Sequence, residues 1–341
     1  MPSHPRVTLA DVARSAGVAP SIVSRLLNGD ARLRIRPDTA RRIRTVVAEL
    51  GYRPHPVGRT LRTSRANAIG IVLPDVTNPI NAEILRGAES AARAAGAGVL
   101  LGSAEELVDH EGPLRDLTGR VDGLVIQRSN AVTDEVLERL INVGIPTVLM
   151  NTDLVGHHGS IRMQDAEAVR IAVEYLNSIG HERIAHIAGA PLTDTATRRR
   201  QGWEQAMEHA GLSIDPSLLV EGGYDVEGGH LGATRLLRTR PRPTALVAAN
   251  VTAALGALAA LRDNGVAVPG EMSVVAIHDV WFAAHSDPSL TTVRLPLYEM
   301  ASRAVEMLFR RMDGAPVETV EVDDVPPELI VRRSTAPPRS S

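Results

Sequence analysis

The amino-acid sequence predicts an α/β protein with an N-terminal all-α helix-turn-helix headpiece, followed by two doubly wound parallel-sheet subdomains. Three observations lead to this prediction. Two short amphipathic patterns meet at a glycine within residues 8–29, basic charge is concentrated in the first 65 residues, and from residue 68 short apolar runs alternate with amphipathic helical patterns. The last pattern is typical of parallel sheets with helices covering both faces.

The first helical pattern begins at Thr8. Its side chain can cap a helix, and Asp11 stands three residues later, as in a capping box. Gly17 permits a sharp turn at the other end of the helix. Apolar residues recur at steps of three and four, which predicts a buried stripe of Leu9, Val12, Ala13 and Ala16.

The second helical pattern starts at Pro20, which loses nothing at a first helical position by lacking an N–H. Its apolar residues are expected to be buried: Ile22, Val23, Leu26 and Leu27. Its outward face is polar: Ser21, Ser24, Arg25 and Asn28. This layout is typical of a helix-turn-helix whose second helix enters the DNA major groove. A three-helix bundle that binds no DNA has the same spacing, so spacing alone leaves both interpretations open.

The charge distribution favours DNA binding. Residues 1–65 hold 13 arginines and four acidic residues, a net charge of +9, whereas the other 276 residues hold 24 arginines and 36 acidic residues, a net charge of −12. A basic terminus of this kind binds polyanions, and counterion release from phosphate supplies non-specific affinity. A third helix is expected from Pro37 to Leu50, with a buried face formed by Ile43, Val46, Val47 and Leu50. Residues 53–67 then form a linker with too little apolar surface to fold alone.

From residue 68, seven apolar runs predict strands at 68–74, 98–102, 122–126, 146–150, 183–189, 243–249 and 272–278. Helical patterns lie between them, for example at 80–95, 133–142, 165–179, 198–210, 226–238 and 252–263. A polar loop at 151–164 divides the runs, so we expect two subdomains separated by a cleft. Ligands of such sheets bind outside the carboxyl ends of the strands, so each binding residue is expected just after an apolar run.

Other classes of protein fit less well. The chain has no cysteine, no signal-peptide pattern and no apolar run near the roughly 18 residues that span a bilayer, so we expect a cytoplasmic protein with no membrane partner. An enzyme is disfavoured, because the segment HERIAH at 181–186 is one residue too long for a zinc motif and GAGVLLG at 96–102 has the wrong spacing for a dinucleotide loop. His157 and His158 fall in a glycine-containing loop and are expected to face solvent. No catalytic residue, metal site or cofactor is therefore expected. A transport protein that binds a solute remains as the alternative, against which the basic headpiece argues.

Residues 6–333 together resemble the lactose/galactose-repressor (LacI/GalR) family of bacterial transcription regulators. The resemblance rests on segments in the family's order: VTLADVARSAGV, VSRLLNG, AELGYRP, RTLRTSRANAIGIVLPDVTNP, YLNSIGHERIAHIAG, VAANVTAALGAL and SDPSLTTVRLP. It implies a sequence-specific regulator, most often a repressor, that binds a pseudo-palindromic operator in double-stranded DNA as a homodimer. It also implies a body like that of periplasmic sugar-binding proteins, which holds a small-molecule effector such as a sugar or sugar acid in its cleft. The implied limits are a headpiece at 1–52, a hinge helix at 53–67, one subdomain at 68–165 with 295–321, another at 166–294 with 322–333, and a disordered tail at 334–341.

The resemblance also implies which residues contact DNA. Pro20, Ser21 and Arg25 match base-reading positions, and Arg25 suits a guanine edge, although an arginine that merely faces solvent is the alternative. Leu61 matches a hinge leucine that wedges into the minor groove, although it could instead pack on the same leucine of the dimer mate. Further contacts are expected from Thr8, Ser24, Asn28, Arg59 and Arg62.

Seven effector-contacting positions follow from the same resemblance: Ile80, Asn81, Arg199, Tyr224, Asn250, His278 and Asp279. The pattern departs from the family at His278, where most members have an aspartate, and an imidazole can become cationic near neutral pH. Arg199 and His278 together would suit an anionic or carboxylate-bearing effector better than a neutral sugar. A solvated helix face for Arg199 and a core role for Tyr224 are the alternatives.

Overall fold

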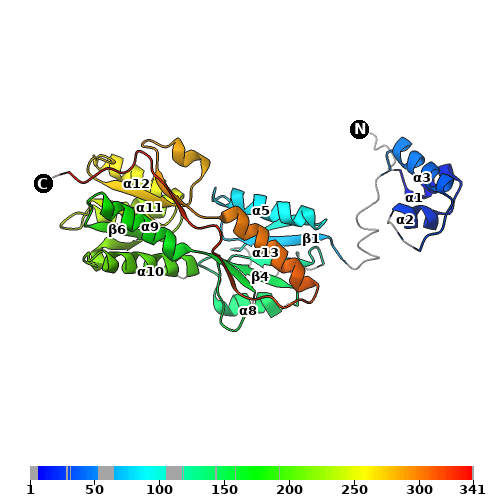
Figure 1. The fold of residues 1–341 in the computed structure, drawn as a ribbon, viewed down its shortest axis with the longest axis horizontal. Coiled ribbons are helices and arrows are strands. Elements are labelled where there is room, and N and C mark those ends of the chain that lie inside the picture. Colours follow the sequence, from blue (N-terminus) through cyan, green and yellow to red (C-terminus); the bar gives the residue numbers. More distant parts are fainter. Residues whose placement is uncertain are drawn as a thin grey trace. The chain divides into compact units, whose positions relative to one another are not determined.

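The computed structural model describes residues 7–27, 30, 32–52, 65–104, 117, 119–142, 144–157, 159–191 and 193–339. They fall into two compact units, Met1–Arg65 and Ala66–Ser341. Figure 1 shows a small helical unit and a larger unit of helices and sheets.

The first unit holds three helices: α1 (Leu9–Ala16), α2 (Pro20–Leu27) and α3 (Pro37–Glu49). The expected capping box is present, since the Thr8 N–H donates to Asp11 Oδ2 at 3.0 Å and the Asp11 N–H donates to Thr8 Oγ1 at 3.3 Å. Gly17 ends α1 in the left-handed conformation at φ 64°. The core of this unit consists of Val12, Ala13, Ala16, Val23, Ile43 and Val46.

Several side chains predicted to be buried in this unit are less so. Leu9, Ile22, Leu26, Leu27 and Val47 are half-buried, and Leu50 is exposed. Three short helices can enclose only one central layer of side chains, so the flanks of each apolar stripe stay partly accessible. The periodicity predicted the correct faces but overestimated the depth of burial.

In the larger unit, the first sheet has the strand order β11-β5-β4-β3-β1-β2. Its strands are β1 (Ala68–Leu73), β2 (Gly98–Ser103), β3 (Gly123–Ile126), β4 (Thr147–Met150), β5 (Ser160–Met163) and β11 (Val320–Val322), and all pairs are parallel. The helices of this half are α5 (Asn81–Ala94), α8 (Asp134–Asn142) and α13 (Leu297–Met312). Strands β1, β3 and β4 are almost wholly buried, as near-continuous apolar runs predict.

The second sheet has the order β12-β10-β9-β8-β6-β7. Its strands are β6 (Ile184–Ala188), β7 (Leu219–Glu221), β8 (Ala245–Ala248), β9 (Ser273–Ile277), β10 (Thr291–Arg294) and β12 (Glu328–Ile330), of which only β12 is antiparallel to its neighbour. The helices are α9 (Asp165–Ser178), α10 (Asp194–His209), α11 (Val226–Leu236) and α12 (Val251–Asp263), with short 3₁₀ turns η1 (Pro216–Leu218) and η2 (Trp281–Ala284). The predicted fold class, an α/β body with two parallel-dominated sheets behind a helical headpiece, is confirmed.

The structure differs from the sequence prediction in the segments that join the sheets. The predicted polar loop 151–164 contains β5, which has no continuous apolar run because only Ile161 and Met163 supply large apolar side chains. Helix α13 and strands β10, β11 and β12 were not among the predicted units. The three strands are each three or four residues long and contain polar residues, so none of them forms a continuous apolar run.

The expected disorder of residues 334–341 is wrong for the part that the structure describes, which ends at residue 339. Ser334 is fully buried; its Oγ donates to Val274 O at 2.6 Å and accepts the Thr291 N–H at 2.8 Å. His181 Nε2 lies 2.9 Å from Ala336 O, and the Tyr175 hydroxyl lies 2.9 Å from the Thr335 hydroxyl. The resemblance implied a free tail, but residues 334–336 instead hydrogen-bond to β9, β10, α9 and His181.

Candidate DNA-facing helix and effector cavity

Helix α2 carries the predicted base-reading residues on its accessible side. Pro20 and Ser21 are exposed, and Ser24 and Arg25 are half-buried. The Arg25 side chain is 43% exposed, and its Nε donates to Asp30 Oδ2 at 2.8 Å. A second contact fixes the carboxylate, because the Arg32 N–H donates to Asp30 Oδ1 at 2.9 Å; this bond and the one from Arg25 lower the pKa of Asp30. The Arg25 guanidinium is therefore held in one orientation while it stays open to a partner.

The other predicted DNA contacts divide into two groups. Thr8 is exposed, but its hydroxyl already makes an intramolecular hydrogen bond, which it donates to Asp11 Oδ2 at 2.6 Å. Asn28, Arg59, Leu61 and Arg62 lie outside the described residues, as does most of the predicted hinge segment.

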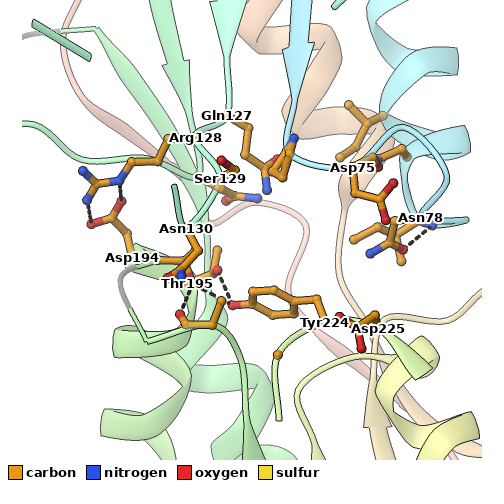
Figure 2. A pocket seen from close by; sticks show the side chains of 18 of the residues that line it. Asp75, Asn78, Gln127, Arg128, Ser129, Asn130, Asp194, Thr195, Tyr224 and Asp225 are labelled. Carbon is orange, nitrogen blue, oxygen red and sulfur yellow. Dashed lines mark hydrogen bonds and ion pairs between the residues drawn. The ribbon is translucent and has the colours of Figure 1, made fainter. Parts of the chain in front are cut away.

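A cavity of about 370 Å³ lies between the two sheets of the larger unit. Its walls come from segments that follow the carboxyl ends of β1, β3 and β4 in one sheet and of β6, β7 and β9 in the other. Figure 2 shows Asp75 and Asn78 on one side, Arg128 and Asp194 on the other, and the Tyr224 ring across the space between them. This is the position that doubly wound sheets give to their ligands.

Five of the seven predicted effector residues line this cavity: Ile80, Asn81, Arg199, Tyr224 and His278. The Tyr224 hydroxyl lies 2.6 Å from Thr195 Oγ1 and 3.1 Å from Thr193 Oγ1, so the ring is held in place from α10 and the residue before it. Tyr224 is half-buried and thus belongs to the cavity wall rather than to the core.

Asn250 and Asp279 do not lie on the cavity, contrary to expectation. Asn250 is fully buried and caps α12: its Oδ1 accepts the Ala253 N–H at 2.7 Å, and its Nδ2 donates to Tyr224 O at 2.9 Å. Asp279 instead binds two arginines, Arg332 just after β12 at 2.7 Å and Arg294 in β10 at 3.0 Å. Burial raises the pKa of Asp279, but hydrogen bonds from these arginines and from Thr292 outweigh that effect and lower it.

Arg199 is the most enclosed cation of the cavity, with a side chain only 2% exposed. Its Nε donates at 2.9 Å to Oδ1 of Asp165, a fully buried carboxylate that also binds Arg198 at 3.0 Å. It donates further to Ala249 O and to His278 Nε2, the latter at 2.9 Å. The Arg199 charge is therefore already matched by protein groups, and its guanidinium lies 6.0 Å from the Tyr224 ring centroid.

The expectation that His278 adds a cation is wrong. Its side chain is buried, and both burial and the nearby Arg199 charge keep its pKa well below the ordinary value, so the imidazole is neutral at pH 7. Since arginine can only donate, His278 Nε2 accepts and Nδ1 carries the proton. This Nδ1–H has no partner among the described residues. An unpaired buried donor costs about 1–3 kcal/mol, which an acceptor on a bound ligand would offset.

The sequence reasoning missed several cavity residues, above all those following β3: Gln127, Arg128, Ser129 and Asn130. A signal was present, because QRSN comes directly after the apolar run DGLVI, where binding residues were expected. Arg128 donates to both oxygens of Asp194 at 3.0 and 3.1 Å, which joins the first sheet to the start of α10. It also contacts Asp134, so this second cationic group of the cavity is matched too.

Two further carboxylates line the cavity without an arginine partner in the described structure, Asp75 and Asp225. Asp75 Oδ1 accepts the Thr77 N–H at 2.8 Å, and Asp225 Oδ1 accepts the Gly228 N–H at 2.6 Å at the start of α11. The cavity therefore presents hydrogen-bond acceptors, amides, hydroxyls and one aromatic face, with no uncompensated positive charge among the residues described.

A helix-turn-helix unit rich in arginine, combined with a cavity between two doubly wound sheets, is the architecture of a DNA-binding transcription regulator. The comparisons with known proteins agree. Residues 8–55 match the bacterial regulatory proteins of the lacI family, and residues 173–335 match the periplasmic binding protein-like domain. The chain belongs to the lacI family of bacterial transcription regulators.

Relatives match over almost the whole chain. It is 32% identical to the HTH-type transcriptional regulator GalS of Salmonella typhimurium over 333 residues, 97% of each protein. It is 31% identical to the HTH-type transcriptional repressor CytR of Escherichia coli, covering 96% of each. The solved lac repressor dimer bound to operator and the anti-inducer ONPF is similar, with a TM-score of 0.83 and 25% identity over 97% of this chain and all of that one. These relatives are regulators and not enzymes.

No helix in the part of the chain that the structure describes is long and apolar enough to cross a membrane.

Proposed function

We propose that this protein is a repressor that binds a pseudo-palindromic operator as a homodimer and responds to a small-molecule effector. The observation that carries the proposal is on the accessible side of α2, where Asp30 binds the Arg25 guanidinium of the basic headpiece while 43% of that side chain stays exposed. An oriented guanidinium can bond guanine O6 and N7 together. The similarity to the lac repressor dimer on its operator supports both the operator and the dimer.

A feature of the second sheet also supports a dimer. Trp281 in η2 is 78% exposed and packs edge-on against Phe282, with ring centroids 5.7 Å apart. Large aromatic side chains in the open are enriched at protein interfaces. We assign this face to contact with a second copy of the chain. Because its target is chromosomal DNA, the regulator acts in the cytoplasm.

For the effector, we propose a neutral polyhydroxylated molecule, such as a sugar, in place of the anion that the sequence favoured. Arg199 and Arg128 are already paired with carboxylates, and His278 is uncharged, so an anion would find no free countercharge. Asp75 and Asp225 can accept hydrogen bonds from hydroxyl groups. A structural relative with 28% identity and a TM-score of 0.71 is the CelR–cellobiose complex.

The operator proposal is tested by selecting duplexes from a random pool with the full-length protein. We expect enriched inverted repeats, one dimer per site, and an affinity that falls steeply as salt rises. Enrichment of no sequence, or of single half-sites bound by monomers, would overturn the proposal. The effector proposal is tested by calorimetry with glucose, ribose and cellobiose against gluconate and glucuronate. Tighter binding of the acids than of the neutral sugars would overturn it.

A further inference from the structure

The α/β body begins at a carboxylate that holds the incoming chain. The two units divide between Arg65 and Ala66, so Ala66 and Asn67 are the first residues of the body after the linker. Asp122 Oδ1 accepts the Ala66 N–H at 2.6 Å, and Asp122 Oδ2 accepts the Asn67 N–H at 2.7 Å. Each carboxylate oxygen thus binds one of two consecutive backbone amides, and bonds to an ionised acceptor are stronger than neutral ones.

These contacts extend the hold on the chain beyond the sheet. The β1–β3 ladder begins only at Ile69, opposite Gly123, whereas the Asp122 side chain binds Ala66, three residues earlier in the chain. The backbone of Asp122 adds a bond to Ala68 O at 2.8 Å. Asn67 has φ 52°, a left-handed conformation that asparagine adopts more readily than most other non-glycine residues. The carboxylate therefore fixes both the position and the direction of the chain where it enters the body.

The same strand connects this clamp to the cavity. Asp122 stands immediately before β3 (Gly123–Ile126), and Gln127, Arg128 and Ser129 follow it on the cavity wall. The rise of an extended chain puts about 17 Å between the two ends of this segment. All four residues of β3 are buried between β1 and β4, so the strand is a stiff connection rather than a loop.

We propose that Asp122 is a positioning residue for DNA binding: it sets where the linker leaves the body, and β3 links that point to the effector cavity. The inference rests on the proposed function, because it concerns how operator binding is supported. It assigns no DNA contact to Asp122 itself. Without the carboxylate, the headpiece arginines remain, but the linker is no longer held at a defined point.

The test compares Asp122→Ala with a matched control, Asp215→Ala. Asp215, which caps the 3₁₀ turn η1, also binds a backbone amide, that of Ser217 at 2.9 Å, and contacts Arg183. We expect Asp122→Ala to lower affinity for the selected operator about tenfold, within the range of measured coupling between sites, and to leave affinity for random duplex unchanged. The amides of Ala66 and Asn67 should exchange hydrogen faster than in the wild type. The control should alter none of these.

A second series separates positioning from general stability. Asp122→Glu keeps two acceptor oxygens and should restore part of the operator affinity, whereas Asp122→Asn keeps one acceptor and should not. If Asp122→Ala melts at the temperature of Asp215→Ala yet binds the operator within twofold of wild type, the inference is overturned. Equal losses on operator and random duplex would also overturn it. A wild-type protein that selects no operator would instead overturn the proposed function.

Discussion

The buried ion pair between Arg199 and Asp165 can be tested directly, because it should neutralise the positive charge of Arg199 in the cavity. Asp165 is fully buried and Arg199 is 2% exposed, so the substitution Asp165→Asn keeps the side-chain size but leaves a buried guanidinium without its countercharge. Arg198 is less affected, because it is 14% exposed and keeps Asp153 at 2.9 Å. Removing one partner of a buried ion pair costs about 3–5 kcal/mol. That is a large share of a typical unfolding free energy of about 5–15 kcal/mol.

The assay is equilibrium unfolding in urea, followed by the fluorescence of Trp203, which is 1% exposed and donates to Ile184 O at 3.2 Å. The matched control is Glu89→Gln. It breaks a surface pair with Arg93 whose side chains are 62% and 73% exposed, and such pairs contribute about 0–1 kcal/mol. We expect the midpoint urea concentration to fall sharply for Asp165→Asn and hardly at all for the control.

A double variant completes the cycle. Adding Arg199→Met to Asp165→Asn removes the uncompensated buried charge. The double variant should therefore be at least as stable as Asp165→Asn alone. If Asp165→Asn unfolds within about 1 kcal/mol of Glu89→Gln, Arg199 is not neutralised by Asp165. Arg199 would then be free to bind an anionic effector.

Three other predictions test the headpiece, the dimer face and the core. Arg25→Ala should weaken operator binding by roughly 1–3 kcal/mol more than random-duplex binding in fluorescence anisotropy, and equal losses would reduce Arg25 to a phosphate contact. Trp281→Arg should shift the protein toward monomer in analytical ultracentrifugation, and an unchanged dimer would place the interface elsewhere. Burial lowers the pKa of His186 from 6.5 to about 4, so the unfolded chain binds the proton first as pH falls. Unfolding free energy should therefore drop by roughly 3 kcal/mol from pH 6.5 to about 4 in urea titrations, and His186→Asn should flatten that slope.

Local chemistry predicted the headpiece well. The Thr8–Asp11 capping box and the left-handed Gly17 follow from residues within one turn of each other, so neighbouring sequence determines them. The strands of both sheets were predicted wherever an apolar run marked burial on two faces. Short edge strands such as β11 were not predicted, because they pair with a strand about 160 residues away in the sequence, as Val320 does with Ile161.

The cavity was predicted in its location but not in its charge. The family resemblance indicated Ile80 and Tyr224, and both line the cavity. The charge of Arg199 is compensated by Asp165, 34 residues away, and its guanidinium also binds His278, 79 residues away. No periodic pattern reports such contacts, since they form only when α9, α10 and the segment after β9 pack together in the folded protein. The sequence therefore identified the charged and polar side chains of the cavity, but not which charges compensate one another.

The order of the chain also has a consequence for how this protein is made. Helix α13 contacts α5, β3, β4 and β5 of the first sheet, and β11 forms the edge of that sheet, yet both follow the whole second sheet except β12. A ribosome therefore releases the first half of the body long before the helix that covers it. The buried apolar face that awaits α13, including Gly123, over which Leu308 lies, stays open to water during that interval. Nascent chains in this state are the ones that chaperones recognise, so yield in the cell should respond to translation rate more than the stability of the finished protein does.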